Sequence, residues 1–235
     1  MNISEWEIKD YFTFENESRK YILHAAIKQL LKINKAKINV LDFGCGDGSL
    51  VQCLNLNSNK VKISMYDINR EILDLAKKKL VGSKVKFYFS KKEIPKNNFD
   101  YVVFSLVLMT LRTKKDILKN LRFLFSLLKK EGVLIIGITH PCFRFASFST
   151  FKTSFTKKNF NYFLEGQNFK VTIVDRKFKR QSQLSDYHWT LSTTLCLIIK
   201  AGFKIIDFIE LPDKAYQKNY FNKFYSPYII ITCKK

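Results

Sequence analysis

The segment "ITHPCF", residues 138–143, places a histidine, a proline and a cysteine in succession after an apolar run. His140 is a candidate general base near neutral pH, because the reference pKa of histidine is about 6.5. Cys142 is the type of side chain that serves as a nucleophile or a metal ligand. Pro141 predicts the end of a strand, since proline cannot donate a ladder hydrogen bond. Which of these chemistries applies depends on what the surrounding elements hold.

A second candidate site is the stretch "VLDFGCGDGS", residues 40–49, where Gly44, Gly46 and Gly48 alternate after a short apolar run. Glycine adopts positive backbone angles and lets a ligand approach the main chain closely. A dinucleotide fingerprint would require glycine three residues after Gly46, but that residue is Ser49. The loop therefore predicts a binding site for a ligand other than a dinucleotide.

Two carboxylates accompany this loop. Asp42 lies at the end of the first predicted strand, where it would repel a pyrophosphate and favours a ligand that carries an amine or a sulfonium. Asp67 ends the next predicted strand, and one carboxylate in that place can accept both hydroxyls of a ribose. The pattern indicates a ligand with a ribose and a positively charged group.

The elements that must position these residues alternate along the chain. Helices are predicted at 18–33, with Ser18 as its cap, and at 45–56, 69–80, 114–130 and 189–202. Strands are predicted at 38–44, 61–68, 84–90, 99–108, 132–139, 203–211 and 227–235. Strands and helices that alternate at this spacing predict an α/β fold, a parallel sheet with helices on both faces.

The chain is predicted to be a single domain over 1–235, with an N-terminal helical cap over 1–38 and an insertion over 143–187. The insertion is rich in aromatic residues: Phe143, Phe145, Phe148, Phe151, Phe155, Phe160, Tyr162 and Phe163. It is interpreted as an apolar lid over a small organic substrate. A stacking surface for single-stranded nucleic acid and a partner interface are the alternatives.

Composition limits the class of protein. A hydrophobic content of 46% and a charged content of 26% in 235 residues are typical of a soluble globular protein. Apolar runs fall short of the ~20 residues that span a bilayer, and the first residues do not resemble a signal peptide. No membrane association and a cytoplasmic location are therefore expected. The five cysteines form no C-x-x-C pair, which indicates reduced thiols and no metal site.

The formal charge of +21 raises the question of a nucleic-acid partner. The basic residues are 34 lysines and 7 arginines, and the lysines are scattered along predicted helix faces. This distribution favours a solvated, lysine-rich surface over a nucleic-acid interface.

Taken in order, "VLDFGCGDGS", "MYDIN", "IPKNNFDYVVFSLVLMTL" and "KKEGVLIIGIT" resemble the motifs of class I S-adenosylmethionine-dependent methyltransferases. The resemblance runs from Val40 to Lys235 and includes the closing segments "AGFKIIDFIELP" and "PYIIITC". It implies a Rossmann-like, seven-stranded, mostly parallel sheet with an antiparallel last strand. It also implies an enzyme that uses S-adenosylmethionine and releases S-adenosylhomocysteine.

By this resemblance, Gly44 and Gly46 would face the methionine portion of the cofactor, Asp67 the ribose and Ile68 the adenine. The full set of predicted cofactor-binding residues is Tyr11, Arg19, Asp42, Gly44, Cys45, Gly46, Asp67, Ile68, Ser90, Ser105 and Leu106.

Other members of that set have roles of their own. Leu106 is expected near the methionine or the acceptor, and Arg19 near the cofactor carboxylate. Tyr11 is expected in a wall opposite the lid. Ser90 stands where many relatives have an aspartate that holds the adenine amino group, so adenine recognition departs from the family pattern here.

His140 and His188 are the predicted catalytic residues, because "THPCF"-like and "YHRTLS"-like segments flank a lid in a bacterial subgroup of small-molecule methyltransferases. Trp189 replaces the basic residue of the second segment, and Cys142 is interpreted as a packed thiol. The favoured function is methylation of an oxygen or nitrogen of a small-molecule acceptor by a monomer or homodimer. An RNA methyltransferase and a non-catalytic cofactor-binding partner subunit are the alternatives.

Overall fold

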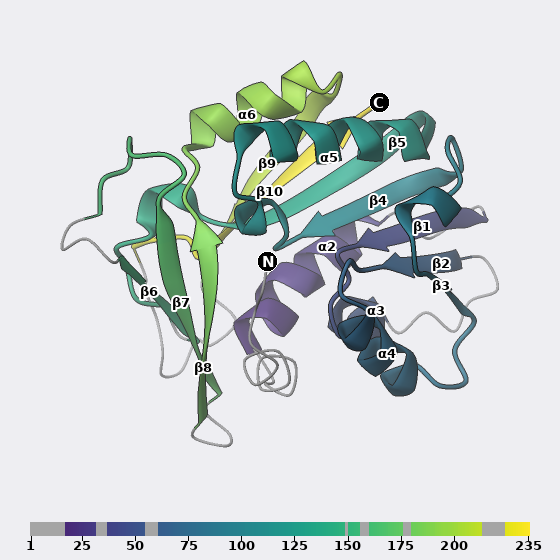
Figure 1. The fold of residues 1–235 in the computed structure, drawn as a ribbon, viewed down its shortest axis with the longest axis horizontal. Coiled ribbons are helices and arrows are strands. Elements are labelled where there is room, and N and C mark those ends of the chain that lie inside the picture. Colours follow the sequence, from purple (N-terminus) through teal and green to yellow (C-terminus); the bar gives the residue numbers. More distant parts are fainter. Residues whose placement is uncertain are drawn as a thin grey trace.

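The fold is built on one sheet of parallel strands (Figure 1). The structure, a computed structural model, describes residues 17–31, 37–54, 61–148, 150–155, 160–175, 180–212 and 224–235. The sheet has seven strands in the order β3-β2-β1-β4-β5-β10-β9. Their bounds are β1 Ile38–Phe43, β2 Val61–Tyr66, β3 Val85–Tyr88, β4 Phe99–Ser105, β5 Leu128–Thr139, β9 Lys204–Leu211 and β10 Tyr228–Lys234.

The first five strands run parallel, whereas β10 lies antiparallel between β5 and β9. The predicted fold class, including the antiparallel last strand, is confirmed. Parallel strands that point the same way bring the ends of β1, β2, β4 and β5 to one edge, which we call the carboxyl edge.

The helices fall largely where periodicity predicts them. They are η1 Arg19–His24, α2 Ala25–Leu30, α3 Ser49–Leu54, α4 Arg70–Lys79, α5 Lys114–Leu127 and α6 Leu191–Lys200, with short 3₁₀ turns η2 Lys91–Glu93, η3 Leu108–Thr110 and η4 Pro141–Phe143. Side-chain oxygens cap the N-termini of three α-helices. Asn69 caps α4 by accepting from Ile72 N–H at 3.2 Å, and Thr113 and Thr190 cap α5 and α6 in the same way.

Alternation of side chains along the strands builds two hydrophobic clusters, one on each face of the sheet. On β4, Val102 and Phe104 belong to the cluster with α5 and α6, whereas Val103 belongs to the cluster with α2, α3 and α4. Residues of β5 divide in the same way, with Ile136 in the first cluster and Ile135 in the second. Strands buried on both faces read as continuous apolar runs, which explains the sequence of β4 and β5.

Ser18 differs from its prediction. It makes no side-chain capping bond; its hydroxyl instead lies 2.5 Å from Thr150 Oγ1 and 2.9 Å from the Tyr228 hydroxyl. The predicted cap is wrong because a long-range partner competes for the same hydroxyl. Ser18 thus joins the N-terminal helix to the insertion and to β10.

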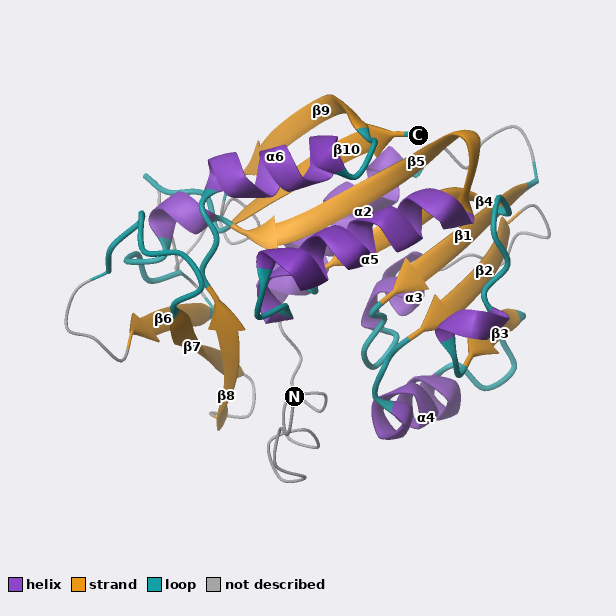
Figure 2. Cartoon of the chain, turned by 45° about the horizontal axis from the view of Figure 1, so that its top comes forward, coloured by secondary structure: helices purple, strands orange, loops and turns teal. Residues whose placement is uncertain are grey.

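The insertion contains a second sheet, β6 Phe151–Phe155, β7 Asn168–Asp175 and β8 Arg180–Tyr187, in antiparallel order β6-β7-β8. Figure 2 shows this lid sheet beside the end of β5. Alternate residues of β7, Phe169, Val171 and Ile173, are buried and belong to the same cluster as α2 and α3. One face of the lid sheet therefore packs inward.

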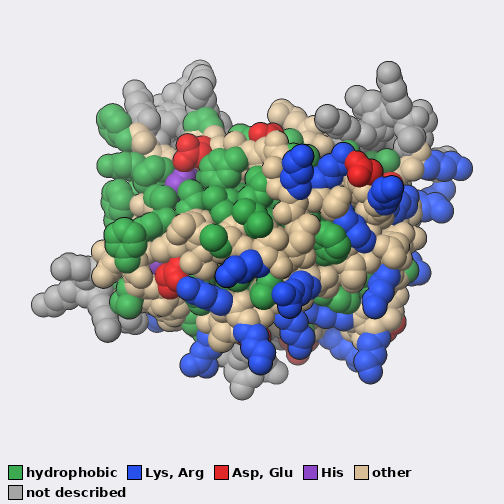
Figure 3. All heavy atoms as spheres, turned by 90° about the horizontal axis from the view of Figure 1, so that it is seen from above, with side chains coloured by type: hydrophobic (Ala, Val, Ile, Leu, Met, Phe, Trp, Pro, Cys, Tyr) green, Lys and Arg blue, Asp and Glu red, His purple; other side chains and the backbone are tan. Residues whose placement is uncertain are grey.

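The surface divides by side-chain type. On the face seen in Figure 3, hydrophobic side chains gather toward the lid, and lysines and arginines toward the other side. Phe145, Phe163 and Leu164 of the lid are large hydrophobic residues that are exposed. In the described ranges, we find no helix with the length and apolar character that a membrane span requires.

The two-cluster arrangement gives a stability prediction. Ile136→Ala should lower the free energy of unfolding by about 2–5 kcal/mol, because it opens a cavity at a fully buried position between the sheet and α5. Val81→Ala, at a side chain that is 84% exposed, should change it by less than about 0.5 kcal/mol. Urea unfolding measures both, and equal effects would contradict the assigned core.

Candidate active site

The loop after β1 depends on glycine for its conformation and for space. Gly44, Gly46 and Gly48 have φ angles of 80°, 53° and 77°, in the left-handed region. A Cβ on Gly44 would lie 2.3 Å from Val107 Cγ2. The N–H groups of Gly44 and Cys45 both donate to the carbonyl oxygen of Tyr66, at 2.7 and 3.1 Å, which fastens the loop to the end of β2.

Asp67 lies directly after β2 and accepts hydrogen bonds from two backbone groups. Gly46 N–H donates to Oδ2 and Asn69 N–H donates to Oδ1, both at 2.9 Å. Burial raises the pKa of Asp67, against the lowering effect of these bonds. A carboxylate oxygen has two lone pairs, so each oxygen retains one for a ligand hydroxyl. The structure thus brings Gly46 and Asp67 together, as the sequence predicts.

Asp42 is buried beneath this loop, and its Oδ2 atom has no hydrogen-bond partner. Burial, with the nearby carboxylates of Asp67 and Asp47, raises the pKa of Asp42 to about 7. A buried carboxylate oxygen without a donor is costly for the folded state. The site therefore favours a ligand that brings a hydrogen-bond donor or a positive charge, and these residues fit the predicted cofactor.

Arg19 lies beside the same loop. Its Nη2 atom is 3.9 Å from Asp47 Oδ1, and Lys79 Nζ is 2.6 Å from Asp47 Oδ2. Burial by itself would raise the pKa of Asp47, but these two cations outweigh it and hold the pKa below its usual value. Tyr11, predicted to face the lid, lies outside the described residues.

Other predicted cofactor residues also lie at the carboxyl edge. Ile68 is 85% exposed although it adjoins the buried end of β2, which leaves an apolar surface beside Asp67. Ser90 follows β3, and its hydroxyl oxygen accepts from Lys92 N–H at 3.2 Å. The hydroxyl hydrogen of Ser90 remains available to donate. Cys45 is buried, and burial raises the pKa of its thiol.

The end of β4 is strained. Leu106 has a φ of 58°, which is uncommon for a leucine, and its N–H donates to Gly137 O at 2.7 Å. Leu106 packs against both hydrophobic clusters. Ser105 Oγ is buried and has no hydrogen-bond partner. Strain and an unpartnered hydroxyl at the carboxyl edge are features of functional sites.

His140 uses both of its ring nitrogens within the protein. Cys142 N–H donates to Nδ1 at 3.2 Å, so the neutral ring carries its proton on Nε2, which donates to Glu210 Oε1 at 2.7 Å. Burial lowers the pKa of His140, although Glu210 acts in the opposite direction. Its ring also packs on Phe143, with centroids 4.3 Å apart.

His188 is similarly engaged and has no exposed surface. Arg144 Nε–H donates to its Nδ1 at 3.2 Å, and its Nε2 donates to the carbonyl oxygen of Tyr162 at 2.7 Å. Burial lowers the pKa of His188 to about 4. Neither predicted catalytic histidine has a free nitrogen in this arrangement, and the structure does not bring the two rings into direct contact.

Sequence reasoning missed three polar residues of the lid region. Arg144, Asp186 and Gln167 surround the His188 position, and Asp186 is 3% exposed. Side chains alternate along β8 and the residue after it, so Leu184, Asp186 and His188 share one face. This alternation is the sequence pattern that could have identified Asp186. That face is buried only because the lid packs inward.

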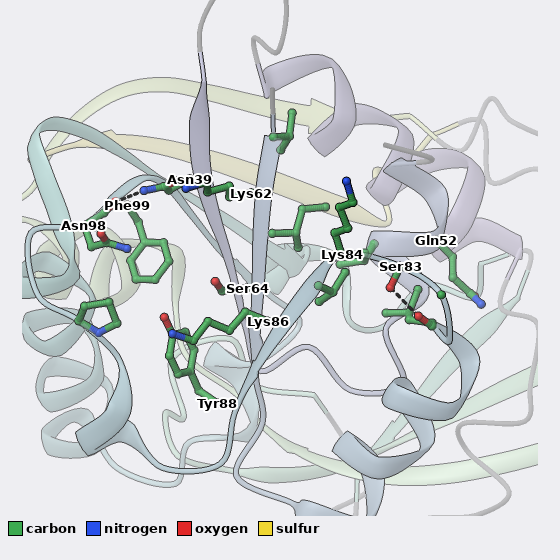
Figure 4. Close-up of a pocket in the computed structure, with 17 residues that line it drawn as sticks. Asn39, Gln52, Lys62, Ser64, Ser83, Lys84, Lys86, Tyr88, Asn98 and Phe99 are labelled. Carbon is green, nitrogen blue, oxygen red and sulfur yellow. Dashed lines mark hydrogen bonds between the residues drawn. The ribbon is translucent and has the colours of Figure 1, made fainter. Parts of the chain in front are cut away.

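A separate groove of about 950 Å³ lies at the opposite edge of the sheet (Figure 4). Its lining includes Asn39, Lys62, Lys86 and Asn98, at the amino ends of the first four strands. Ligands of doubly wound sheets bind at the carboxyl ends instead. Among the described residues, no group of three or more His, Cys, Asp or Glu side chains is arranged to hold a metal ion.

Comparison with known proteins shows which family the chain resembles in sequence. A methyltransferase domain family model matches residues 16–144, more than half of the chain. The Bacillus subtilis protein YqeM, named as a methyltransferase, is 27% identical over 145 residues, which cover 58% of either protein. The ubiquinone/menaquinone biosynthesis C-methyltransferase UbiE of Rickettsia typhi is 27% identical over 163 residues, covering 60% of this chain and 64% of UbiE.

The aligned region thus spans about three fifths of the length of these two relatives. Among solved structures, an S-adenosylmethionine-dependent methyltransferase from Mesorhizobium loti superposes with a TM-score of 0.63 at 16% identity, over 90% of this chain and 96% of that one. The predicted class of protein, a methyltransferase, is confirmed. The chain belongs to the methyltransferase domain family and has the fold of the S-adenosylmethionine-dependent enzymes.

Proposed function

We propose that the protein transfers a methyl group from S-adenosylmethionine to an oxygen or nitrogen of a small-molecule acceptor. The observation that carries the proposal is the meeting of the glycine loop, Asp67 and the unpartnered Asp42 at one edge of the sheet. In this proposal Asp67 accepts the ribose hydroxyls, and Ile68 and Ser90 adjoin the adenine. Gly44, Gly46 and Arg19 hold the methionine end.

The bound cofactor supplies a methyl group on a positively charged sulfonium. The contribution of the protein is alignment, which can supply up to about 7–11 kcal/mol of the barrier reduction. Asp42 and Asp67 favour positive charge at the loop. Ser105 and the strained Leu106 lie at the end of β4, on the side from which the acceptor approaches.

The proposed acceptor is a small organic molecule beneath the lid. Aromatic side chains of the lid, including Phe155 and Phe160 with ring centroids 4.9 Å apart, offer an apolar surface that excludes water. We assign His140 and His188 to positioning: His140 joins the end of β5 to Glu210 of β9, and His188 joins Arg144 to the carbonyl oxygen of Tyr162. The Rickettsia relative is named as a C-methyltransferase of ubiquinone/menaquinone biosynthesis, which supports an organic acceptor but differs from this proposal in the methylated atom, carbon.

An RNA acceptor is the alternative, and the lysines in the groove at the amino ends favour it. That groove lies across the sheet from the glycine loop. RNA held there would not present a base at the carboxyl edge, so we prefer the small molecule. A cofactor-binding partner subunit without activity is a further alternative.

Isotope transfer tests the acceptor class. The protein is incubated with methyl-labelled S-adenosylmethionine and extract of its source cells, and the products are separated by size. Label in the small-molecule fraction is expected. Label in RNA would favour the alternative, and absence of label despite cofactor binding would favour the non-catalytic subunit.

Asp67→Ala should weaken S-adenosylmethionine binding by about 100- to 10,000-fold in calorimetry, because it removes both charge-assisted hydrogen bonds to the ribose hydroxyls. Asp74→Ala, at an exposed position of α4, is the control and should leave affinity unchanged. Asp67→Asn retains one acceptor oxygen and should give an intermediate loss. An unaltered affinity in folded Asp67→Ala would refute the ribose assignment.

Gly44→Ala should lower both cofactor affinity and the free energy of unfolding, because its Cβ meets Val107 and its φ is positive. Gly82→Ala provides a matched control with a φ of 81° and open space around the added Cβ. Its cost should be backbone strain alone, about 1–2 kcal/mol. Equal effects of the two substitutions on unfolding would show that the approach of Val107 does not constrain the loop.

A further inference from the structure

Most of the unpartnered buried polar atoms lie in two places, the carboxyl edge of the large sheet and the lid. Seven buried side-chain nitrogen and oxygen atoms of the described residues have no hydrogen-bond partner. Five of them belong to Asp42 and Ser105 at the carboxyl edge and to Gln167 and Asp186 in the lid. Buried polar atoms without partners are rare in folded proteins, so each requires an explanation.

Gln167 and Asp186 share one face of the lid sheet. Asp186 lies opposite Phe169 in the β7–β8 ladder, and Gln167 continues that ladder opposite His188, with His188 N–H donating to Gln167 O at 2.8 Å. The two side chains are therefore diagonal neighbours on the inward face. Both atoms of the Gln167 amide and Oδ1 of Asp186 are unpartnered.

Neighbouring polar groups do not satisfy them, because those groups are already engaged. Arg144 donates to His188 Nδ1 and to Thr139 Oγ1, at 3.2 and 2.9 Å, and its guanidinium lies 4.3 Å from the Phe169 ring centroid. Arg144 is thereby held beside Asp186, and both nitrogens of His188 are occupied. These bonds use two of the five N–H donors of Arg144, and none of the five bonds to the unpartnered atoms.

The β6-β7-β8 sheet lies beyond the carboxyl ends of β4 and β5 (Figure 1), and Asp186 shares its inward face with Phe169. Phe169, beside Asp186, belongs to the same hydrophobic cluster as Cys45, and Leu106 packs against that cluster. Phe155 packs on Phe169 with ring centroids 5.3 Å apart. A flat apolar molecule with one or two polar groups complements such a surface.

We propose that Asp186 and Gln167 form the polar end of the acceptor-binding site, and that the acceptor is an aromatic compound with a hydroxyl or amino group. This inference rests on the proposed function. The acceptor donates its hydroxyl or amino hydrogen to Asp186 Oδ1, and Gln167 pairs with a second polar group. As its lone pair forms the bond to the methyl carbon, the electron pair of the broken carbon–sulfur bond stays on sulfur and the proton passes to Asp186.

Burial supports the role of Asp186 as a base. It raises the pKa of Asp186 to about 7, although Arg144 acts in the opposite direction. A base with a pKa near the working pH combines an ionised fraction with a useful affinity for the proton. His140 and His188 have no free nitrogen for this task.

The experiment uses phenol, catechol, aniline and benzylamine as acceptors, benzoate as a carboxylate comparison, and methyl-labelled S-adenosylmethionine. The wild-type protein should methylate at least one hydroxyl or amino compound, and Asp186→Asn should reduce kcat by about 100- to 10,000-fold with unchanged cofactor affinity. Gln167→Leu should raise KM more than it lowers kcat. Asp207→Asn and Gln183→Leu, at exposed positions, are the matched controls.

Several results would overturn the inference. Turnover of Asp186→Asn within twofold of the wild type would remove Asp186 as the base. Methylation of benzoate alone, or of none of the compounds by protein that binds the cofactor, would refute the acceptor class. Failure of the wild-type protein to bind S-adenosylmethionine would instead refute the proposed function itself.

Melting temperature provides a readout that needs no acceptor. If Gln167 serves a ligand, Gln167→Leu should melt at or above the wild-type temperature, because it removes a buried unpartnered amide. Asp186→Asn does not serve in this measurement, because it would leave the buried guanidinium of Arg144 without that carboxylate. A lowered melting temperature of Gln167→Leu would show that this side chain stabilises the lid, and would contradict the proposal.

Discussion

The hydrogen bond from Gly46 N–H to Asp67 joins the ends of β1 and β2, and the carboxyl edge is arranged around it. The bond requires the loop after β1 to turn back sharply, which positive φ angles at its glycines permit. Val107 approaches the same loop at Gly44, where a side chain would clash with it. The loop is thus constrained by the second strand on one side and by the segment after β4 on the other.

Acidic side chains outnumber basic ones around the glycine loop. Asp42, Asp47 and Asp67 lie close enough to influence one another, and Arg19 and Lys79 compensate Asp47. Asp42 is left buried with an oxygen that no donor meets. Negative potential next to exposed backbone suits a cationic nucleoside better than a phosphate, in agreement with the methyltransferase family.

Buried polar groups in and beside the lid are of two kinds, those that are fully hydrogen-bonded and those with an unpartnered atom. His140 and His188 each connect two segments distant in sequence, His140 to Glu210 and His188 to Arg144 and Tyr162. His140 thereby joins β5 to β9, and His188 joins two segments of the lid region. Asp186 lies near His188 with Oδ1 unpartnered, and its proposed role in binding the acceptor rests on this contrast.

The order of strands and helices, the glycine loop and Asp67 could be predicted from sequence, because each depends on patterns within a few residues. Short apolar runs identified buried strands, and the glycine spacing identified the tight turn after Phe43. The engagement of His140 and the hydroxyl of Ser18 could not be predicted in this way, because their partners lie 70 or more residues away. Residue type alone made His140 a candidate base, whereas its two hydrogen-bond partners support the positioning role proposed for it. Gln167 and Asp186 likewise became neighbours only through the β7–β8 ladder, and their burial through the packing of the lid. Local sequence determined which elements form, and tertiary structure decided which polar atoms are left without partners, since burial and pairing depend on contacts between distant segments.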